Sequence, residues 1–401
     1  MDGKRLIRTL RLENLLSYGS AGEQVSLEPL NVLIGSNATG KSNLMEAVAL
    51  LRAMPKDVAA VVREGGGIGE WLWKGGRDNP VAEVEALIDY PEKLRSLRYR
   101  MHFAASGQRF EIVHESVAEE QPDKNEDTIH FFYRYRGGNQ PEFNVRKHLL
   151  NGTTAWSSHS PEFRTFSVEQ SVLAQVKDPS QYPELAYLSN QFSRIRLFRW
   201  DMGRKTELRK PQSADLPVDF LEEDASNMGL VINDMEHQGL KSLLVEYLRK
   251  FYEPVDDITV RVYGGTTLTY LHEKGFSRPV SVSRLSDGTL RYLCLLTVLC
   301  HPTPPPLICI EEPELGLHPD MLPTIAELLV EASQRTQLIV TTHSDVLVSA
   351  LTSISESVVV CERDETGSHL RRLDSEHLKK WLEKYSLGEL WRMGELGGTR
   401  W

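Results

Sequence analysis

Hydrophobic and polar positions along this chain change their spacing several times. Residues 6–34 hold short apolar runs typical of strands and lead into a glycine-rich turn, after which 42–54 has the spacing of a helix. From about 81 to 166, apolar and polar residues alternate in short runs separated by Gly, Asn and Pro, which predicts an antiparallel β-rich lobe. Helical spacing returns from about 171 and again over 229–252.

The last third of the chain alternates strands with helices. Strand-like runs occupy 306–310, 337–342 and 357–364, with helical runs between them. This alternation favours a mostly parallel sheet covered on both faces. We therefore predict a single α/β domain over 1–401, with an N-terminal part (1–80), a β-lobe (81–170), a helical lobe with a connecting strand (171–280) and a C-terminal part (281–401).

Composition restricts the class of protein only broadly. The hydrophobic share of 40% and the charged share of 25% are those of a folded globular protein and exclude pervasive disorder. A net charge of −10 means that contact with DNA would need a local basic patch. No apolar run resembles a signal peptide or a membrane span, so we expect no membrane partner.

The four cysteines, Cys294, Cys300, Cys309 and Cys361, form no C-x-x-C pair. This spacing gives no sign of a zinc site or a disulfide framework. Buried free thiols are predicted, which suits a reducing cytoplasm.

The sharpest chemical signal is the segment GSNATGKS at 35–42, a G-x-x-x-x-G-K-S loop between a strand and a helix. Backbone N–H groups in such a loop cradle phosphates, helped by the positive end of the following helix. Lys41 would reach the β- and γ-phosphates, and the Ser42 hydroxyl would ligate Mg²⁺. The candidate nucleotide-binding residues of the loop are Gly35, Ser36, Asn37, Ala38, Thr39, Gly40, Lys41 and Ser42.

Three further motifs follow along the chain. LICIEEPE is an apolar strand ending in adjacent carboxylates, of which Glu311 would face a metal through water and Glu312 would polarise an attacking water. In LSDGT, Ser286 and Gly288 lie at a predicted helix N-terminus, a position that favours anions. His343 follows an apolar strand, where it could donate a hydrogen bond to a γ-phosphate.

In this order, the four motifs resemble the ABC-type ATPase head shared by SMC, RecF-like and OLD-type proteins. The ending YSLGELWRMGELGGTRW resembles that of compact stand-alone bacterial ATPases of the same branch. The resemblance covers most of the chain. It implies a P-loop NTPase fold with a mostly parallel core sheet, an antiparallel β-lobe and a helical lobe, and ATP and Mg²⁺ as cofactors.

The resemblance also assigns roles. It implies that Glu311 holds the Walker B metal position, that Glu312 is the catalytic carboxylate and that His343 is the switch histidine. Ser286 and Gly288 would contact the nucleotide held by a second subunit. Two departures stand out, since many relatives have Asp at the position of Glu311 and transporters often have Gly at the position of Asp287.

The family implies a further metal ligand, a glutamine that ends a strand of the β-lobe before a helix. Gln170 fits this description and Gln175 is the competitor. We favour Gln170, because Ser171 after it makes a plausible N-cap.

The function implied by the resemblance is ATP hydrolysis coupled to head dimerisation. Two heads would sandwich two Mg-ATP molecules and separate after hydrolysis, in the cytoplasm, with a nuclease or other effector, or DNA, as partner. Genome maintenance and defence against phage are the implied settings. The alternatives are a nucleotide-dependent scaffold with negligible turnover, the nucleotide-binding subunit of a transporter and a small-molecule kinase.

A basic stretch at 194–210 holds Phe198 and Trp200 between its cations. Such a stretch can grip phosphates and stack on bases. It equally fits a strand with paired arginines followed by a solvated loop, or a docking segment for a partner protein.

Overall fold

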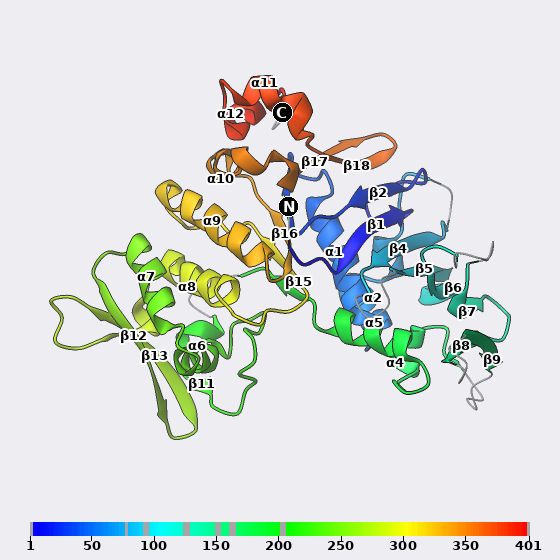
Figure 1. Ribbon diagram of the computed structural model, residues 1–401, viewed down its shortest axis with the longest axis horizontal. Helices are drawn as coiled ribbons and strands as arrows, with labels where there is room; N and C mark the ends of the chain where they lie inside the picture. The colour runs from blue at the N-terminus through cyan, green and yellow to red at the C-terminus, as the bar shows by residue number, and fades with distance from the viewer. Residues whose placement is uncertain are drawn as a thin grey trace.

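A six-stranded sheet runs through the middle of the molecule (Figure 1). The computed structural model describes residues 3–76, 79–90, 96–122, 129–148, 154–159, 166–200 and 206–398. Neighbouring strands of the core sheet are parallel up to β17, and β18 is antiparallel to it. In spatial order the strands are β10 (Arg196–Phe198), β15 (Leu307–Glu311), β16 (Gln337–Thr341), β3 (Leu30–Ile34), β17 (Val358–Asp364) and β18 (Gly367–Arg372).

Both faces of the core sheet are covered, as expected of parallel strands with near-continuous apolar runs. In β3, Leu33 packs into a cluster with α1 (Lys41–Ala53), whereas Val32 packs into a second cluster with α8 (Asp287–Leu299) and α9 (Leu322–Ser333). The predicted α/β class with a mostly parallel core is therefore confirmed.

An eight-stranded antiparallel sheet forms the β-lobe, on the right in Figure 1. The sequence predicted an antiparallel lobe, but not that the two first strands join it. Four helices lie beside this lobe: α2 (Val58–Glu64), α3 (Ile68–Trp71), α4 (Val172–Gln175) and α5 (Pro183–Ser193). The strand order is β2 (Glu23–Ser26), β1 (Ile7–Glu13), β4 (Ala82–Ile88), β5 (Leu97–Ser106), β6 (Arg109–Glu119), β7 (Phe131–Arg136), β8 (Glu142–His148) and β9 (Thr154–His159).

On the other side of the core lies the helical lobe, built from α6 (Met228–His237) and α7 (Lys241–Phe251) with a small antiparallel sheet (Figure 1). The sequence predicted one strand here, whereas the sheet also includes strands on either side. Its strands are β11 (Gln212–Ser213), β12 (Val255–Tyr263), β13 (Thr266–Glu273) and β14 (Val280–Ser281). Short 3₁₀ turns lie at Glu207–Arg209, Val282–Arg284, Pro319–Met321 and Thr352–Ser357.

The C-terminal segment adds α10 (Asp345–Ala350), α11 (Ser375–Leu382) and α12 (Leu387–Arg392), seen at the top of Figure 1. Within the described ranges, no helix combines the length and the apolar character needed to cross a bilayer. The predicted free and buried state of the four cysteines is confirmed, and burial raises the pKa of each thiol.

Candidate functional site

The glycine-rich loop connects the end of β3 to the start of α1. Gly35 and Gly40 both have positive φ, +148° and +104°. A Cβ at Gly35 would lie 2.3 Å from the carbonyl oxygen of Cys361, and one at Gly40 would lie 2.5 Å from the Ser368 hydroxyl. The Tyr18 hydroxyl donates to the Gly40 carbonyl at 3.0 Å. Glycine is required at both positions by conformation and by space.

The side chain of Lys41 folds back onto its own loop, where backbone carbonyls hold it. Lys41 is 6% exposed, and its Nζ donates to the carbonyl oxygens of Gly35 at 2.9 Å and Ser36 at 2.8 Å. Burial lowers the pKa of Lys41, because the charged form loses solvation. The ammonium group of Lys41 thus bonds carbonyl oxygens of its own loop. In a nucleotide complex, phosphate oxygens would accept these hydrogen bonds instead.

A turn near the C-terminus, at Gly398, packs against the glycine-rich loop. Gly398 donates its backbone N–H to the carboxylate of Glu362 at 3.0 Å and accepts a bond from the Trp391 indole at 3.2 Å. A Cβ at Gly398 would lie 3.2 Å from the Cα of Gly35. Gly398 therefore packs against Gly35, the first glycine of the loop, a contact that the sequence did not predict.

A cavity of about 140 Å³ lies at the loop. Among the described residues, it brings the loop together with Glu312 and His343, the two candidate catalytic residues. Gly35, Ser36 and Thr39 shape the loop without lining the cavity. The lining residues are Asn37, Ala38, Gly40, Lys41, Ser42, Asn43, Glu312, Thr341 and His343.

Glu312 follows β15 in a left-handed conformation, with φ of +43°. For a residue with a side chain this conformation costs about 1 kcal/mol or more and persists only where surroundings impose it. Its N–H donates to the Thr341 carbonyl at 3.0 Å, and its carbonyl accepts from Arg291 at 3.3 Å. The carboxylate then lies 3.5 Å from Nε2 of His343.

Glu314 holds the backbone of His343 in place by hydrogen bonding. Its Oε1 accepts the backbone N–H of His343 and the hydroxyl of Thr342, both at 2.7 Å. Its Oε2 is buried without a hydrogen-bond partner in the described structure, and burial raises the pKa of Glu314. The sequence pattern gave Glu314 no role, although it lies within the acidic motif.

Arg199 contacts the other acidic residue of the motif. Because β10 pairs in parallel with β15 and aligns Phe198 with Ile310, the next residues of the two segments, Arg199 and Glu311, lie side by side. Nε of Arg199 lies 2.9 Å from Glu311, and its Nη1 lies 2.6 Å from Glu46 of α1. The sequence pattern did not indicate this residue as part of the site.

The oxygen donors near the loop fit a magnesium ion shared with a nucleotide. Ser42 lies at the start of α1, Glu311 is the last residue of β15 and Glu312 follows it. Ser42 and Glu312 line the cavity, whereas Glu311 does not. The described part of the chain contains no group of three or more His, Cys, Asp or Glu that could hold a metal alone. Mg²⁺ is usually held by one or two carboxylates together with substrate phosphates, so this donor set suits it.

The LSDGT motif at 285–289 lies apart from this cavity. Ser286 is the N-cap of α8 and accepts the Thr289 N–H at 3.1 Å. Arg209 holds the loop before it, donating to the carbonyls of Ser283 and Leu285 and pairing with Asp287. Ser286 and Gly288 do not line the cavity at the P-loop of their own chain, as far as the described residues show.

Gly288 is also required by packing. A Cβ there would lie 2.3 Å from the carbonyl oxygen of Gly316, so one of the two backbones would have to move. We expect Gly288→Ala to lower the free energy of unfolding by about 1–3 kcal/mol, measured by chemical denaturation without nucleotide. Gly69→Ala is the matched control, since nothing lies within 4 Å of a Cβ at this helical position. Equal stability of the two variants would contradict the packing argument.

The structure does not bring Gln170 into the site. Gln170 is exposed in the turn before α4, where its carbonyl accepts the side-chain amide of Gln175 at 2.8 Å. The neighbouring Glu169 lines a cavity with residues of α2 and of the β5–β6 turn. The amide of Gln175 is bonded within the same turn to Ser167. Neither glutamine lines the P-loop cavity in the described structure, and the metal role of Gln170 stays a prediction.

Part of the basic stretch at 194–210 makes contacts inside the molecule. Phe198 and Trp200 are buried, so they offer no face to a base. Arg199 and Arg209 pair with acidic residues of the motifs described above. Of the alternatives left open by the sequence, base stacking by Phe198 and Trp200 is contradicted by their burial, and a strand is present at Arg196–Phe198. Residues 201–205 lie outside the described residues.

Comparison with known proteins shows which fold this chain has. A family model described as "AAA domain, putative AbiEii toxin, Type IV TA system" matches residues 30–349. The chain is similar to an Smc head bound to the C-winged helix domain of ScpA, with a TM-score of 0.55 and 14% identity, over 93% of this chain and 99% of that one.

It is also similar to an Smc head domain with an extended coiled coil, bound to the C-terminal domain of ScpA, from Pyrococcus furiosus. The TM-score is 0.56 and the identity 15%, over 94% of this chain and 99% of that one. No curated protein matches the chain. These likenesses show that the fold is that of an SMC-type ATPase head, as the resemblance of the motifs implied.

Proposed function

This chain belongs to the AAA-domain family whose model covers residues 30–349, and from that premise we propose that it binds and hydrolyses ATP with Mg²⁺. The observation that carries the proposal is the convergence of Lys41, Glu312 and His343 on one cavity from three separate segments. Lys41 and the loop N–H groups bind the phosphates. Glu312 takes a proton from the attacking water, and His343 donates a hydrogen bond to the γ-phosphate.

In this proposal Ser42 and Glu311 hold Mg²⁺, which neutralises the developing charge on the phosphates when it is bound. Arg199 pairs with Glu311 at 2.9 Å, so it must release that carboxylate before Glu311 can serve the metal. Arg199 is thus a positioning residue of the proposed site.

We further propose that ATP links two copies of the chain. Ser286 and Gly288 lie outside the cavity of their own chain, which leaves the serine and the α8 N-terminus available to phosphates held by a second copy. ATP would be gripped from both sides, and hydrolysis would release the pair. In this proposal the switch controls a separate effector, such as a nuclease, in genome maintenance or phage defence, within a reducing cytoplasm that suits four buried free thiols.

Steady-state ATP hydrolysis with and without double-stranded DNA tests the proposed activity. We expect turnover that requires Mg²⁺. The absence of turnover under every condition, with ATP still bound, would favour a nucleotide-dependent scaffold. One observation supports that second candidate, the ion pair that occupies Glu311.

Replacing Arg199 tests its hold on Glu311. Exposed ion pairs are worth up to about 1 kcal/mol, so Arg199→Gln should lower the Mg²⁺ concentration for half-maximal ATP binding by about two- to fivefold. Calorimetric titration of ATP at graded Mg²⁺ concentrations measures the shift. Arg196→Gln is the control, because the Arg196 side chain donates to backbone carbonyls, those of Ser193 and Ile195. An unchanged or raised Mg²⁺ requirement in Arg199→Gln would contradict the competition.

A further inference from the structure

A second and larger cavity lies at the opposite ends of the same core strands. Its wall includes Pro306 and Arg335, which come just before β15 and β16 begin, whereas Glu312 and Thr341 line the P-loop cavity where these strands end. Its volume is about 840 Å³. Cavities that bind small molecules commonly measure roughly 300–1,000 Å³, so this one is large enough for a ligand of nucleotide size.

The charge of this cavity is opposite to that of the chain. Five cations and a single carboxylate, Asp89, lie among its described lining residues, in a protein with a net charge of −10. The cations come from the N-terminal segment, the end of α5 and the end of α9. They are Lys4, Arg5, Arg8, Arg194 and Arg335.

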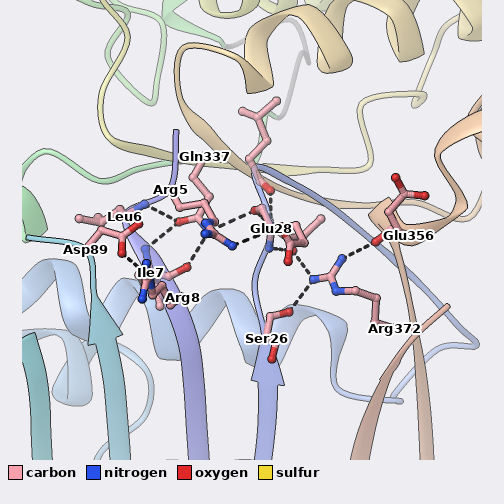
Figure 2. Close-up of polar contacts among 12 residues, drawn as sticks. Arg5, Leu6, Ile7, Arg8, Ser26, Glu28, Asp89, Gln337, Glu356 and Arg372 are labelled. Carbon is pink, nitrogen blue, oxygen red and sulfur yellow. Dashed lines mark hydrogen bonds and ion pairs between the residues drawn. The ribbon is translucent and has the colours of Figure 1, made fainter. Parts of the chain in front are cut away.

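The N-terminal wall is fixed to the core. The side-chain amide of Gln337, at the start of β16, accepts the N–H groups of Leu6 and Ile7 at 3.1 and 2.9 Å and donates to the Ile7 carbonyl at 2.8 Å (Figure 2). Gly3 packs so closely that a Cβ there would lie 2.6 Å from the Ser333 carbonyl oxygen. The cations of this segment are therefore presented by an anchored backbone.

Carboxylates neutralise only part of this charge. Arg8 pairs with Asp89 at 2.5 Å and lies 3.9 Å from Glu120, and Arg5 lies 3.4 Å from Glu28. Figure 2 shows Arg5, Arg8 and these two partners, Asp89 and Glu28, close to Gln337.

The other three cations have no carboxylate partner in the part of the chain that the structure describes. Arg335 donates to the carbonyls of Leu299 at 2.6 Å and Glu331 at 3.3 Å, and its Nε is buried without a bond. Lys4 and Arg194 are exposed, and their side chains make no hydrogen bond or ion pair with another described residue. Like charges held close together repel, and an anion bound among them removes that cost.

An aromatic pair completes the wall. The rings of Tyr90 and Tyr187 lie 4.7 Å apart, and the Tyr187 hydroxyl donates to the Asp89 carbonyl at 2.7 Å. Together with prolines of the 302–306 loop they add apolar surface to the lining of the basic cavity. Such a combination suits a ligand with phosphates at one end and a sugar or base at the other.

We propose that this cavity is a second phosphate-binding site that takes a nucleoside phosphate, either free or at the 5′ end of a DNA strand. The site is independent of the P-loop. Arg194 and Lys4 bind the phosphates from the solvent side and Arg335 from the core side. The proposal gives the acidic protein the local basic patch that contact with a polyanion needs.

The test uses the full chain carrying Lys41→Ala, so that the P-loop does not contribute. The probes are ATP, followed by calorimetry, and a short fluorescein-labelled 5′-phosphorylated single-stranded DNA, followed by anisotropy. A charge-assisted hydrogen bond accounts for about tenfold in affinity, so adding Arg194→Glu should weaken binding of the responding probe by about tenfold or more. Lys4→Glu should act in the same direction.

Arg278→Glu is the matched control, since it makes the same charge change at an exposed residue outside the cavity. If DNA responds, the slope of log affinity against log salt should fall by about 0.7 for each phosphate that the variant no longer neutralises. A response to ATP alone assigns the site to a free nucleotide, and a response to the labelled strand assigns it to nucleic acid. If neither probe binds, or if Arg194→Glu and Arg278→Glu bind alike, the proposal is wrong.

Discussion

Lys41→Ala should reduce ATP affinity by about a hundredfold or more, the largest loss of binding we expect from a single substitution. Losing one partner of a desolvated, hydrogen-bonded charge pair costs about 2–5 kcal/mol, and each 1.4 kcal/mol is tenfold in affinity. The Nζ of Lys41 bonds two carbonyls of its own loop, so the loop itself holds the ammonium group in place. The reduced affinity should therefore come from the missing ammonium group and not from a disordered loop.

The same substitution should leave the fold intact. Burial lowers the pKa of Lys41, which means that the unfolded chain holds this proton more tightly than the folded protein. The charged lysine therefore destabilises the folded state at every pH below its lowered pKa, and the effect disappears above the unfolded pKa. Alanine removes this cost together with two hydrogen bonds, so the two changes offset each other in part.

Calorimetric titration with ATP and Mg²⁺, with a thermal melt of each variant, tests both expectations. Lys56→Ala is the control, because it removes the same side chain from an exposed position just after α1. Wild-type affinity in Lys41→Ala with a normal melt would mean that the measured ATP binds elsewhere, and the basic cavity would be the next place to examine.

Most of what the sequence predicted about the site came from short local motifs. The spacing of GSNATGKS defines its own geometry, because the glycines, the lysine and the helix start lie within eight consecutive positions. Strands β15 and β16 are short apolar runs, and the residues that follow such parallel strands meet at one edge of a sheet. Glu312 and His343 could therefore be placed together from sequence alone.

Contacts between segments that lie far apart in the sequence could not be predicted from local patterns. Arg199 meets Glu311 only because β10 pairs with β15, about a hundred positions later, and no local pattern records that pairing. The same is true of the turn at Gly398, which packs on Gly35 from the other end of the chain. The basic cavity draws its cations from three segments that lie far apart in the sequence, so no local pattern shows that they meet.

Gln170 shows what a family description leaves undetermined. The description of a strand end before a helix fits 166–175, but it does not determine how that segment lies relative to the P-loop. Ser171 does cap α4, as expected, and donates its hydroxyl to the buried Glu115. The local prediction was right, while the position of that helix relative to the P-loop depends on packing within the β-lobe.

Glu312→Gln should slow hydrolysis by about a hundred- to ten-thousandfold, the range attributed to a positioned general base, while ATP binds with nearly unchanged affinity. Glutamine has the same shape, and the backbone bonds from Glu312 to Thr341 and Arg291 are kept. The left-handed conformation of this position is therefore maintained. Phosphate release from ATP in single-turnover conditions measures the chemical step. An unchanged rate would remove Glu312 from the catalytic role.

Blocked hydrolysis should also make the proposed dimer persist. With ATP, Glu312→Gln should change in mass by light scattering from 45.5 kDa toward twice that value, whereas the wild type should return to monomers as ATP is consumed. Adding Ser286→Arg removes the N-cap hydroxyl of α8 and places a bulky cation at its start, at a cost of about 1 kcal/mol to the helix. This double variant should bind ATP yet stay monomeric, because its own P-loop cavity does not involve Ser286. Dimers that form equally well in the double variant would mean that the α8 N-terminus does not grip the nucleotide of a second copy.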